Sequence, residues 1–389
     1  MINNYILLFR KNFKIIKPLN SNFLNPTMGC SCSKIKEVSK PQPKSSPVES
    51  DCQIPSENLP SYLKNFSEFN KTISPMLYKP MDQKHNCSRY VEALKPYLIG
   101  SCNMKRPNNT AEYDHFYNSM LKGKASSPSV LKTKRINSEI KMLSKNLPLN
   151  YTNSIFLKYD ESRMDLMKSL IIGSDDTPYA SGVYIYDIFL DDTYPNSPPK
   201  MNLITTGNNT IRFNPNLYTN GYICLSLLGT WSGDNIEKWN SQTSNILQIL
   251  LSIQSIVMSE GVYFNEPGYS SDKNSLANKA LNLGYSNIVR YANVKFAMNE
   301  QIKKMPKGFE DIIRTHFLFK KEDILKTCYK WAEESKNETL LPDYGGLVSS
   351  HNNILASKFK GERTAYGTML LEEIKELEKN FMKLENKEL

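Results

Sequence analysis

One cysteine of this chain lies in a setting that suits a nucleophile. Cys224 opens a short apolar stretch, and an Asn-Pro-Asn turn ends eight residues before it at Asn216. A rigid turn at this spacing can fold back and bring an asparagine amide close to the thiol. Such an amide is a hydrogen-bond donor that stabilises an oxyanion formed at a thioester carbonyl. The spacing therefore predicts acyl-transfer chemistry, with Cys224 as the nucleophile and Asn216 as the donor.

Both residues also have a plainer interpretation. Cysteine is often a buried structural thiol, so Cys224 alone does not indicate catalysis. The Asn216 amide, likewise, can hydrogen-bond its own loop instead of an oxyanion. A cysteine protease would need a histidine base, and the sequence has no signature of one. The four histidines, His85, His115, His316 and His351, all lie far from Cys224 in the sequence.

The segment around Cys224 resembles the active site of the ubiquitin-conjugating enzymes. Their signature is His-Pro-Asn, seven further residues, and then the catalytic Cys followed by Leu. Asn216 and Cys224 match it position for position, whereas Asn214 stands where most of the family has His. The other family landmarks follow in order: Ile172 to Gly182 with its Thr-Pro-Tyr, Tyr194 to Pro199, Trp239, and Leu250 to Ser255.

A smaller group within that family is more similar still, namely the Apollon-type conjugating domain of the conjugating/ligase hybrids. The shared motifs are Phe213 to Tyr218, Thr230-Trp231, Glu237 to Asn240 and Tyr263 to Tyr269. Asparagine at position 214 is a trait of this group, which explains the departure from His. The resemblance runs from about Tyr90 to Ser335.

The resemblance implies an α+β ubiquitin-conjugating (UBC) fold, in which helices flank a four-stranded antiparallel meander and extra helices follow on the C-terminal side. It implies that Cys224 accepts ubiquitin, or a ubiquitin-like modifier, as a thioester from an activating enzyme and passes it to a substrate lysine. A ubiquitin ligase and protein substrates are the further partners. No cofactor is expected, since the activating enzyme uses the ATP. Glu266 stands where the family commonly has an acid that orients and desolvates the amine; a solvated loop acid is the alternative.

Two other functions stay open within the same family. In the first, the chain is a catalytically silent variant that binds ubiquitin or a partner without carrying it, although such variants usually lose the Cys that this chain keeps. In the second, it is a self-sufficient conjugating/ligase hybrid in which residues 61–125 or the tail select substrates. The giant hybrids carry further domains, so the length of this chain weakens the second hypothesis.

Charge and cysteine usage argue against several other classes. The chain has 389 residues and a net charge of +10, but residues 126–290 hold fourteen basic and fourteen acidic side chains. A protein that reads nucleic acid would carry its positive excess on the folded domain, so no nucleic-acid partner is expected. The seven cysteines form no CxxC pair and no zinc ligand set, so no metal site is expected either. Their odd number fits a reducing compartment, and the chain has no apolar run of about 18 residues that would span a membrane.

The N-terminal region carries a second signal. If translation starts at Met28, Gly29 becomes the N-terminal residue with Ser33 at the offset that N-myristoylation requires. Cys30 and Cys32 can then take palmitate, and two acyl chains tether a protein stably to a membrane. Alternatively, the motif is an accident inside a linker, and residues 1–27 resemble a mitochondrial presequence. We expect a cytoplasmic protein, tethered to a membrane by acylation if Met28 is the initiator.

Periodicity predicts the elements of the central region. An amphipathic helix has its apolar stripe at Leu131, Ile136, Ile140 and Leu143, and its basic side at Lys132, Lys134 and Arg135. The resemblance assigns this basic side to binding the activating enzyme; a solvated charged face is the alternative. Four strands are predicted at 155–159, 166–172, 184–190 and 201–205. A helix over 245–258, capped by Ser244, follows.

The chain divides into five predicted parts. They are a disordered basic segment with the acylation motif (1–60), a partly ordered extension (61–125), the UBC catalytic core (126–290), a helical extension (291–345) and an amphipathic tail helix (346–389). An insert at 229–238 either gates the thiol or is a surface loop. Two helices are expected at about 287–303 and 321–335. The tail repeats Leu370, Ile374, Leu377, Phe381 and Leu384 at spacings of four and three residues, which predicts a coiled-coil or docking helix.

Overall fold

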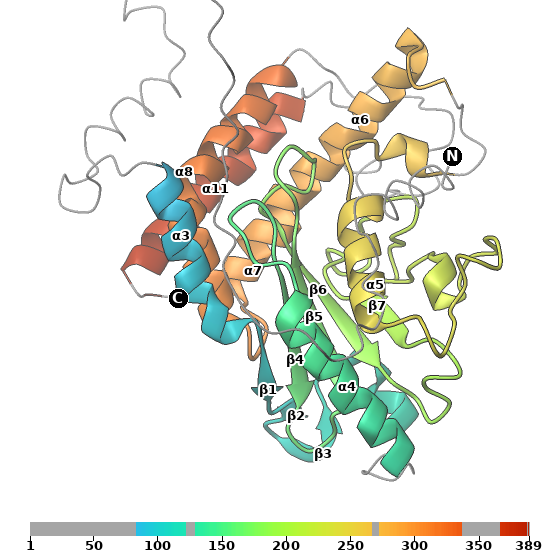
Figure 1. Cartoon of the computed structure of the whole chain (residues 1–389). Coiled ribbons are helices and arrows are strands. Elements are labelled where there is room, and N and C mark those ends of the chain that lie inside the picture. The colour runs from blue at the N-terminus through green and yellow to red at the C-terminus, as the bar shows by residue number, and fades with distance from the viewer. Residues whose placement is uncertain (1–82, 122–128, 267–271, 337–365, 387, 389) are drawn as a thin grey trace, which may run out of the picture. The chain divides into compact units, whose positions relative to one another are not determined.

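The computed structural model describes residues 83–121, 129–266, 272–336, 366–386 and 388 of the chain (Figure 1). The predicted disordered segment 1–60, with Gly29 and its acylation motif, lies outside the described residues. Within the described ranges, no helix is both long enough and apolar enough to cross a membrane.

A five-stranded sheet lies between the helices (Figure 1). Strands β4 (Ile155–Asp160), β5 (Leu166–Ile172), β6 (Val183–Phe189) and β7 (Lys200–Leu203) form an antiparallel meander. The four predicted strands are therefore confirmed, as is the α+β class. The fifth strand, β1 (Ile99–Cys102), pairs in parallel with β4. Sequence reasoning missed it because the four residues Ile-Gly-Ser-Cys are too few to show a period of two.

One face of the sheet packs against the main core. Two helices contribute to this core, α4 (Val130–Asn146) and α5 (Ile246–Ser252), and a π-helical turn, η4 (Ile253–Val257), extends α5. Because side chains alternate along a strand, every second residue points into the core. Leu157, Tyr186 and Leu203 do so from three different strands, and they pack in one cluster with Ile136 of α4 and Leu250 of α5.

The N-terminus of α5 corrects the predicted cap. Asn245 is the N-cap residue: its Oδ1 accepts a hydrogen bond from Gln248 N (3.0 Å), and Gln248 Oε1 accepts one from Asn245 N (3.1 Å). Ser244 Oγ accepts a hydrogen bond from Asn240 N instead (2.9 Å). Asn and Ser cap helices about equally well, but only Asn245 has a Gln three residues later to complete a capping box.

The basic side of α4 also differs from the prediction. Lys132 is buried in an ion pair with Asp165 (3.1 Å), whereas Leu131, expected in the apolar stripe, is 78% exposed. Asp165 is itself buried beside β5, and a buried carboxylate needs a positive partner. Arg135 is half-buried and donates to two loop carbonyls at 2.7 and 2.6 Å. The lysines that remain exposed on α4 are Lys134, Lys141 and Lys145.

Residues 103–121 cover part of the opposite face of the sheet. The short strands β2 (Lys105–Arg106) and β3 (Asn109–Tyr113) form a hairpin, and the 3-10 helix η2 (Phe116–Leu121) follows. Met104, Tyr113 and Leu121 pack there on Leu166 and Phe189, the cross-strand pair that points away from the main core.

The helices after the sheet begin earlier than predicted. α6 (Leu276–Ala292) continues through the π-helical stretch η6 (Asn293–Asn299) into α7 (Glu300–Lys303), and α8 spans Glu310–Glu334. The predicted starts at 287 and 321 are wrong by eleven residues each. The first turns of α6 are mostly exposed and carry no apolar stripe. The start of α8 does bury Ile312, Ile313 and Phe317, but the polar His316 and Lys320 lie buried among them and interrupt the apolar pattern.

A buried histidine joins α8 to α3 (Gln83–Leu94), which is followed by the 3-10 turn η1 (Lys95–Tyr97). Tyr90 Oη donates a hydrogen bond to His316 Nδ1 (2.9 Å), and His316 Nε2 donates one to Ser181 O (3.0 Å). A neutral imidazole satisfies both bonds. Burial, with a smaller contribution from Lys320, lowers the pKa of His316 to about 3. The His316 side chain is therefore uncharged at neutral pH while the chain is folded.

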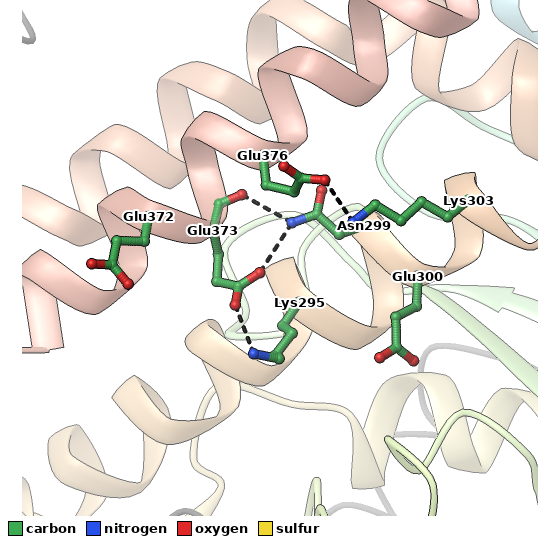
Figure 2. Close-up of a pocket in the computed structure, with 7 residues that line it drawn as sticks. All are labelled: Lys295, Asn299, Glu300, Lys303, Glu372, Glu373 and Glu376. Atoms are coloured by element: carbon green, nitrogen blue, oxygen red, sulfur yellow. Dashed lines mark hydrogen bonds and ion pairs between the residues drawn. The ribbon is translucent and has the colours of Figure 1, made fainter. Parts of the chain in front are cut away.

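The tail helix α11 (Tyr366–Glu385) packs on α8, η6, α6 and α7 of the same chain. The predicted seam residues Leu370, Ile374, Leu377, Phe381 and Leu384 are all buried. Along one edge, Lys295 pairs with Glu373 (2.8 Å), Lys303 pairs with Glu376 (2.6 Å), and Asn299 Nδ2 donates to Glu373 O (2.9 Å), as Figure 2 shows. These side chains line a cavity of about 300 Å³. The seam therefore belongs to a helix that docks on its own chain.

Candidate active site

The loop from Arg212 to Cys224 folds back on itself, as its turn predicts. Leu217 forms isolated bridges with both Asn214 and Ile223, and Cys224 N donates a hydrogen bond to Asn216 O (2.9 Å). The backbone of Asn216 therefore lies directly beside that of the cysteine. Gly221 allows this return: its φ is +81°, and a Cβ at this position would meet Leu203 O at 2.2 Å.

Asn214 holds the turn from inside. This side chain is fully buried, and its Oδ1 accepts a hydrogen bond from Asn216 N (2.9 Å). Its Nδ2 donates to Tyr179 Oη (3.0 Å) and to Val257 O (2.8 Å). The residue that replaces the family's usual His thus connects the Asn216 backbone to Tyr179 and to the end of η4. A buried amide with its polar atoms paired fixes the loop in one conformation.

The Asn216 side chain is in a different situation. It is half-buried, and within the described part of the chain its amide has no hydrogen-bond partner. The two bonds that anchor this residue, to Asn214 Oδ1 and from Cys224 N, both use its backbone. Among the described residues, its side chain therefore takes no part in holding the loop.

The Cys224 thiol is nearly covered. The residue is 8% exposed, and Sγ donates a hydrogen bond to Thr230 O at 3.6 Å. Burial raises the pKa of the Cys224 thiol, and the negative charge of Glu266 raises it further, while the positive charge of Arg212 lowers it. At neutral pH the sulfur therefore carries its proton in most molecules.

Thr230, the second residue of the insert, closes over the cysteine. It follows the 3-10 turn η3 (Ser226–Leu228) and Gly229, whose φ is +68°. Thr230 Oγ1 donates to Ile223 O (2.7 Å) and accepts from Leu225 N (2.8 Å), while its carbonyl accepts from Tyr222 Oη (3.2 Å). At this end, the insert is therefore bonded to the residues on both sides of the thiol.

Glu266 enters the site from the other side. It follows the 3-10 turn η5 (Tyr263–Asn265) and is about one-third exposed, and its Oε2 lies 3.5 Å from Arg212 Nη2. Asn265 Nδ2 donates to Val257 O (3.0 Å), the same carbonyl that Asn214 binds. The structure thus brings Cys224, Asn216 and Glu266 to one place, although Glu266 is 42 residues from the cysteine in the sequence.

Sequence reasoning gave no role to Arg212 or Thr230. Thr230 stood within a matching motif and Arg212 directly before one, but nothing in their spacing indicated an interaction with Cys224. An arginine between apolar residues and a turn was the one available signal, since a buried arginine requires partners. Among the described residues, no group of histidine, cysteine, aspartate or glutamate side chains is arranged to hold a metal ion.

The histidines with described side chains bind elsewhere. His115 Nε2 contacts Met167 O (3.0 Å), and His316 binds Tyr90 and Ser181. Neither contacts Cys224. The side chain of His85 and the whole of His351 lie outside the described part of the chain.

Comparison with known proteins gives the class to which this site belongs. Residues 135–279 match the family model for the ubiquitin-conjugating enzyme. The chain is 35% identical over 240 residues to a putative ubiquitin-conjugating enzyme E2 39 of Arabidopsis thaliana, covering 62% of this chain and 70% of the relative. The chain therefore belongs to the ubiquitin-conjugating enzyme family.

Two further relatives place the chain within that family. It is 36% identical over 293 residues to the human dual E2 ubiquitin-conjugating enzyme/E3 ubiquitin-protein ligase BIRC6, over 74% of this chain but 6% of the relative. It is 44% identical over 207 residues to probable ubiquitin-conjugating enzyme protein 17 of Caenorhabditis elegans, over 53% of this chain and 28% of the relative. These matches confirm the resemblance to the conjugating/ligase hybrids. The chain spans only a small part of either protein.

Proposed function

We propose that this chain is a working ubiquitin-conjugating enzyme that carries ubiquitin as a thioester on Cys224 and transfers it to a substrate lysine. The observation that carries the proposal is the hydrogen bond from Cys224 N to Asn216 O (2.9 Å), in a chain of this family. It sets the backbone of the cysteine beside that of Asn216, whose side-chain amide has no partner among the described residues. A thiol with an adjacent free donor is the arrangement that acyl transfer needs.

The first step is charging by transthiolation. Cys224 loses its proton, and the thiolate attacks the thioester that links the ubiquitin C-terminus to the activating enzyme. A new thioester forms on Cys224, the old one breaks, and the thiol of the activating enzyme is released. Because one thiol replaces another, the exchange is nearly isoenergetic. A small thiolate fraction suffices, since thiolate is a strong nucleophile.

The second step is transfer to an amine. A substrate lysine, after losing its proton, attacks the Cys224 thioester, and the carbonyl oxygen becomes an oxyanion. We assign the Asn216 amide to that oxyanion. Glu266, on the opposite side of the site, would orient and desolvate the amine. Collapse of the intermediate forms the isopeptide bond and expels the Cys224 thiolate.

The second candidate function is a silent module that binds ubiquitin or a partner. The observation in its favour is the low exposure of Cys224, which is 8% exposed and has its Sγ bonded to Thr230 O. A nearly buried thiol is hard for a second protein to reach while the insert stays in place. We favour catalysis because the chain keeps both the Cys and the Asn of the family's signature, and the backbones of Cys224 and Asn216 lie side by side.

The partners follow from the proposed reaction. They are ubiquitin or a ubiquitin-like modifier, its activating enzyme, a ubiquitin ligase and protein substrates. The exposed lysines of α4, Lys134, Lys141 and Lys145, are the surface we assign to the activating enzyme. The activating enzyme consumes the ATP, and the chain needs no cofactor of its own. Acylation at Gly29, with membrane attachment of a cytoplasmic protein, remains a proposal from the sequence.

The proposal is tested by a charging reaction with the purified chain, an activating enzyme, ATP and ubiquitin. We expect a band heavier by one ubiquitin that reductant removes. Cys224→Ala should abolish the band, and Cys224→Ser should convert it to an ester that resists reductant. If no band forms with a panel of activating enzymes and modifiers, the chain is the silent module.

A further inference from the structure

We propose that Arg212 is a positioning residue of this site, which braces the Asn-Pro-Asn turn, holds Glu266 by its carboxylate and sets a positive charge against Cys224. The inference deepens the proposed function and rests on it for the chemical role of the cysteine. The charge relation among the three side chains, however, is a property of the chain alone. It is therefore testable without ubiquitin.

The guanidinium of Arg212 reaches three different parts of the site. Its side chain is 4% exposed, and both Nε (3.2 Å) and Nη2 donate to Pro215 O. Its Cζ lies 4.0 Å from the centre of the Tyr218 ring, and Nη2 lies 3.5 Å from Glu266 Oε2. A planar fork that also stacks on a ring can make these contacts together, which a lysine cannot.

Two of these contacts act on groups that the reaction uses. Pro215 lies between Asn214 and Asn216, so the bonds to its carbonyl clamp the turn that carries the oxyanion donor. The ion pair keeps Glu266 at the edge of the site, although the residue follows a turn well separated in sequence. Removing the guanidinium would release both at once.

The same guanidinium counters an unfavourable charge at the sulfur. Among the described residues, the charged groups that act on Cys224 are Glu266, which raises its pKa, and Arg212, which lowers it. The sulfur bears negative charge twice in the proposed reaction, as the attacking thiolate in charging and as the leaving group in transfer. Without the positive charge of Arg212, the negative charge of Glu266 would destabilise both the attacking thiolate and the departing thiolate of Cys224.

A purely structural role makes a different prediction. If Arg212 only braced the turn, every substitution would impair the site at all pH values alike. If its charge matters, Arg212→Lys should keep the pH dependence of Cys224 even where it loosens the turn. Arg212→Gln removes the charge but keeps a polar side chain, and it should shift that dependence.

The experiment measures alkylation of Cys224 by iodoacetamide across a range of pH, in the full chain, with the modified peptide quantified by mass spectrometry. An opposite charge nearby shifts a pKa by about one unit, so Arg212→Gln should alkylate roughly tenfold more slowly at a fixed pH below the midpoint. Glu266→Gln should move the midpoint to lower pH. The double variant should return towards wild type, and Arg212→Lys should stay close to it.

A matched control is available elsewhere in the chain. Arg290 also combines a ring, Trp331 at 5.5 Å, with a carboxylate, Glu334 at 3.2 Å. Arg290→Gln should leave the Cys224 profile unchanged. If Arg212→Gln does not fold, Glu266→Gln still tests the charge. An unshifted midpoint in Glu266→Gln, or in a folded Arg212→Gln, would overturn the proposal.

The result is distinguishable from failure of the proposed function. Alkylation requires no ubiquitin, so shifted midpoints with no charging of the wild-type chain would support the role of Arg212 and refute conjugation. Where the wild type does charge, Arg212→Gln should charge more slowly at neutral pH and regain rate as the pH rises. A charging defect that no pH relieves would assign Arg212 to bracing alone.

Discussion

Replacing Asn216 by alanine should separate the transfer step from the integrity of the site. The two hydrogen bonds that anchor Asn216, from Cys224 N and to Asn214 Oδ1, both use its backbone, at 2.9 Å each. Its side chain has no partner among the described residues, so alanine removes one donor and leaves the loop in place. Loss of one oxyanion donor costs about 10² to 10³ in rate, or roughly 2.7 to 4 kcal/mol of barrier.

The assay is a single-turnover discharge. The chain is charged with ubiquitin, the activating enzyme is stopped, free lysine is added, and the decay of the thioester is followed. Asn216→Ala should still charge, because thiol exchange is nearly isoenergetic, but its thioester should decay about 10² to 10³ times more slowly. Asn146→Ala, at the exposed end of α4, is the control. Discharge of Asn216→Ala at the wild-type rate would refute the donor role, whereas Asn214→Ala, which disrupts the loop itself, should fail at both steps.

Three further predictions follow from the packing. His316 has an unfolded pKa near 6.5 and a folded pKa of about 3, so the unfolded chain binds the extra proton and stability falls as the pH drops from about 6.5 to 3; we expect a loss of about 2 kcal/mol between pH 7 and pH 5 by denaturant titration, which His316→Gln should largely abolish. Leu377→Ala should cost about 2 to 5 kcal/mol, measured in the same way, while exposed Met382→Ala should change little. Thr230→Val removes the Oγ1 bonds that hold the insert, so Cys224 should alkylate faster, and an unchanged rate would argue that the insert does not gate the thiol.

Local sequence was sufficient for the four strands of the meander and for half of the site. The meander has short β-branched and aromatic segments separated by Gly, Asp and Pro, and each such segment became a strand. Cys224 and Asn216 are eight residues apart with a proline turn and a glycine nearby, so a single loop brings them together. Contacts between residues this close in the sequence can be predicted from the spacing of residue types.

The parts that sequence did not predict depend on contacts between distant segments. Arg212 meets Glu266 across 54 residues, and Lys132 meets Asp165 across 33. Neither pair has a fixed spacing, because folding of the sheet and of η5 brings the partners together. Lys132 was assigned to a solvated basic face for the same reason, because its partner Asp165 lies far away in the sequence. Strand β1 is defined by pairing with β4 and not by its own four residues.

The central claim is that Cys224 itself carries the modifier. The most direct measurement is the intact mass of the chain after reaction with activating enzyme, ATP and ubiquitin, followed by peptide mapping of the Cys224→Ser variant, whose ester survives digestion. We predict one added ubiquitin, less one water, on the wild-type chain, which excess thiol removes by thioester exchange, and an ester mapped to position 224 in the variant. A ubiquitin adduct that persists in Cys224→Ala, or an ester mapped to another residue, would contradict the account.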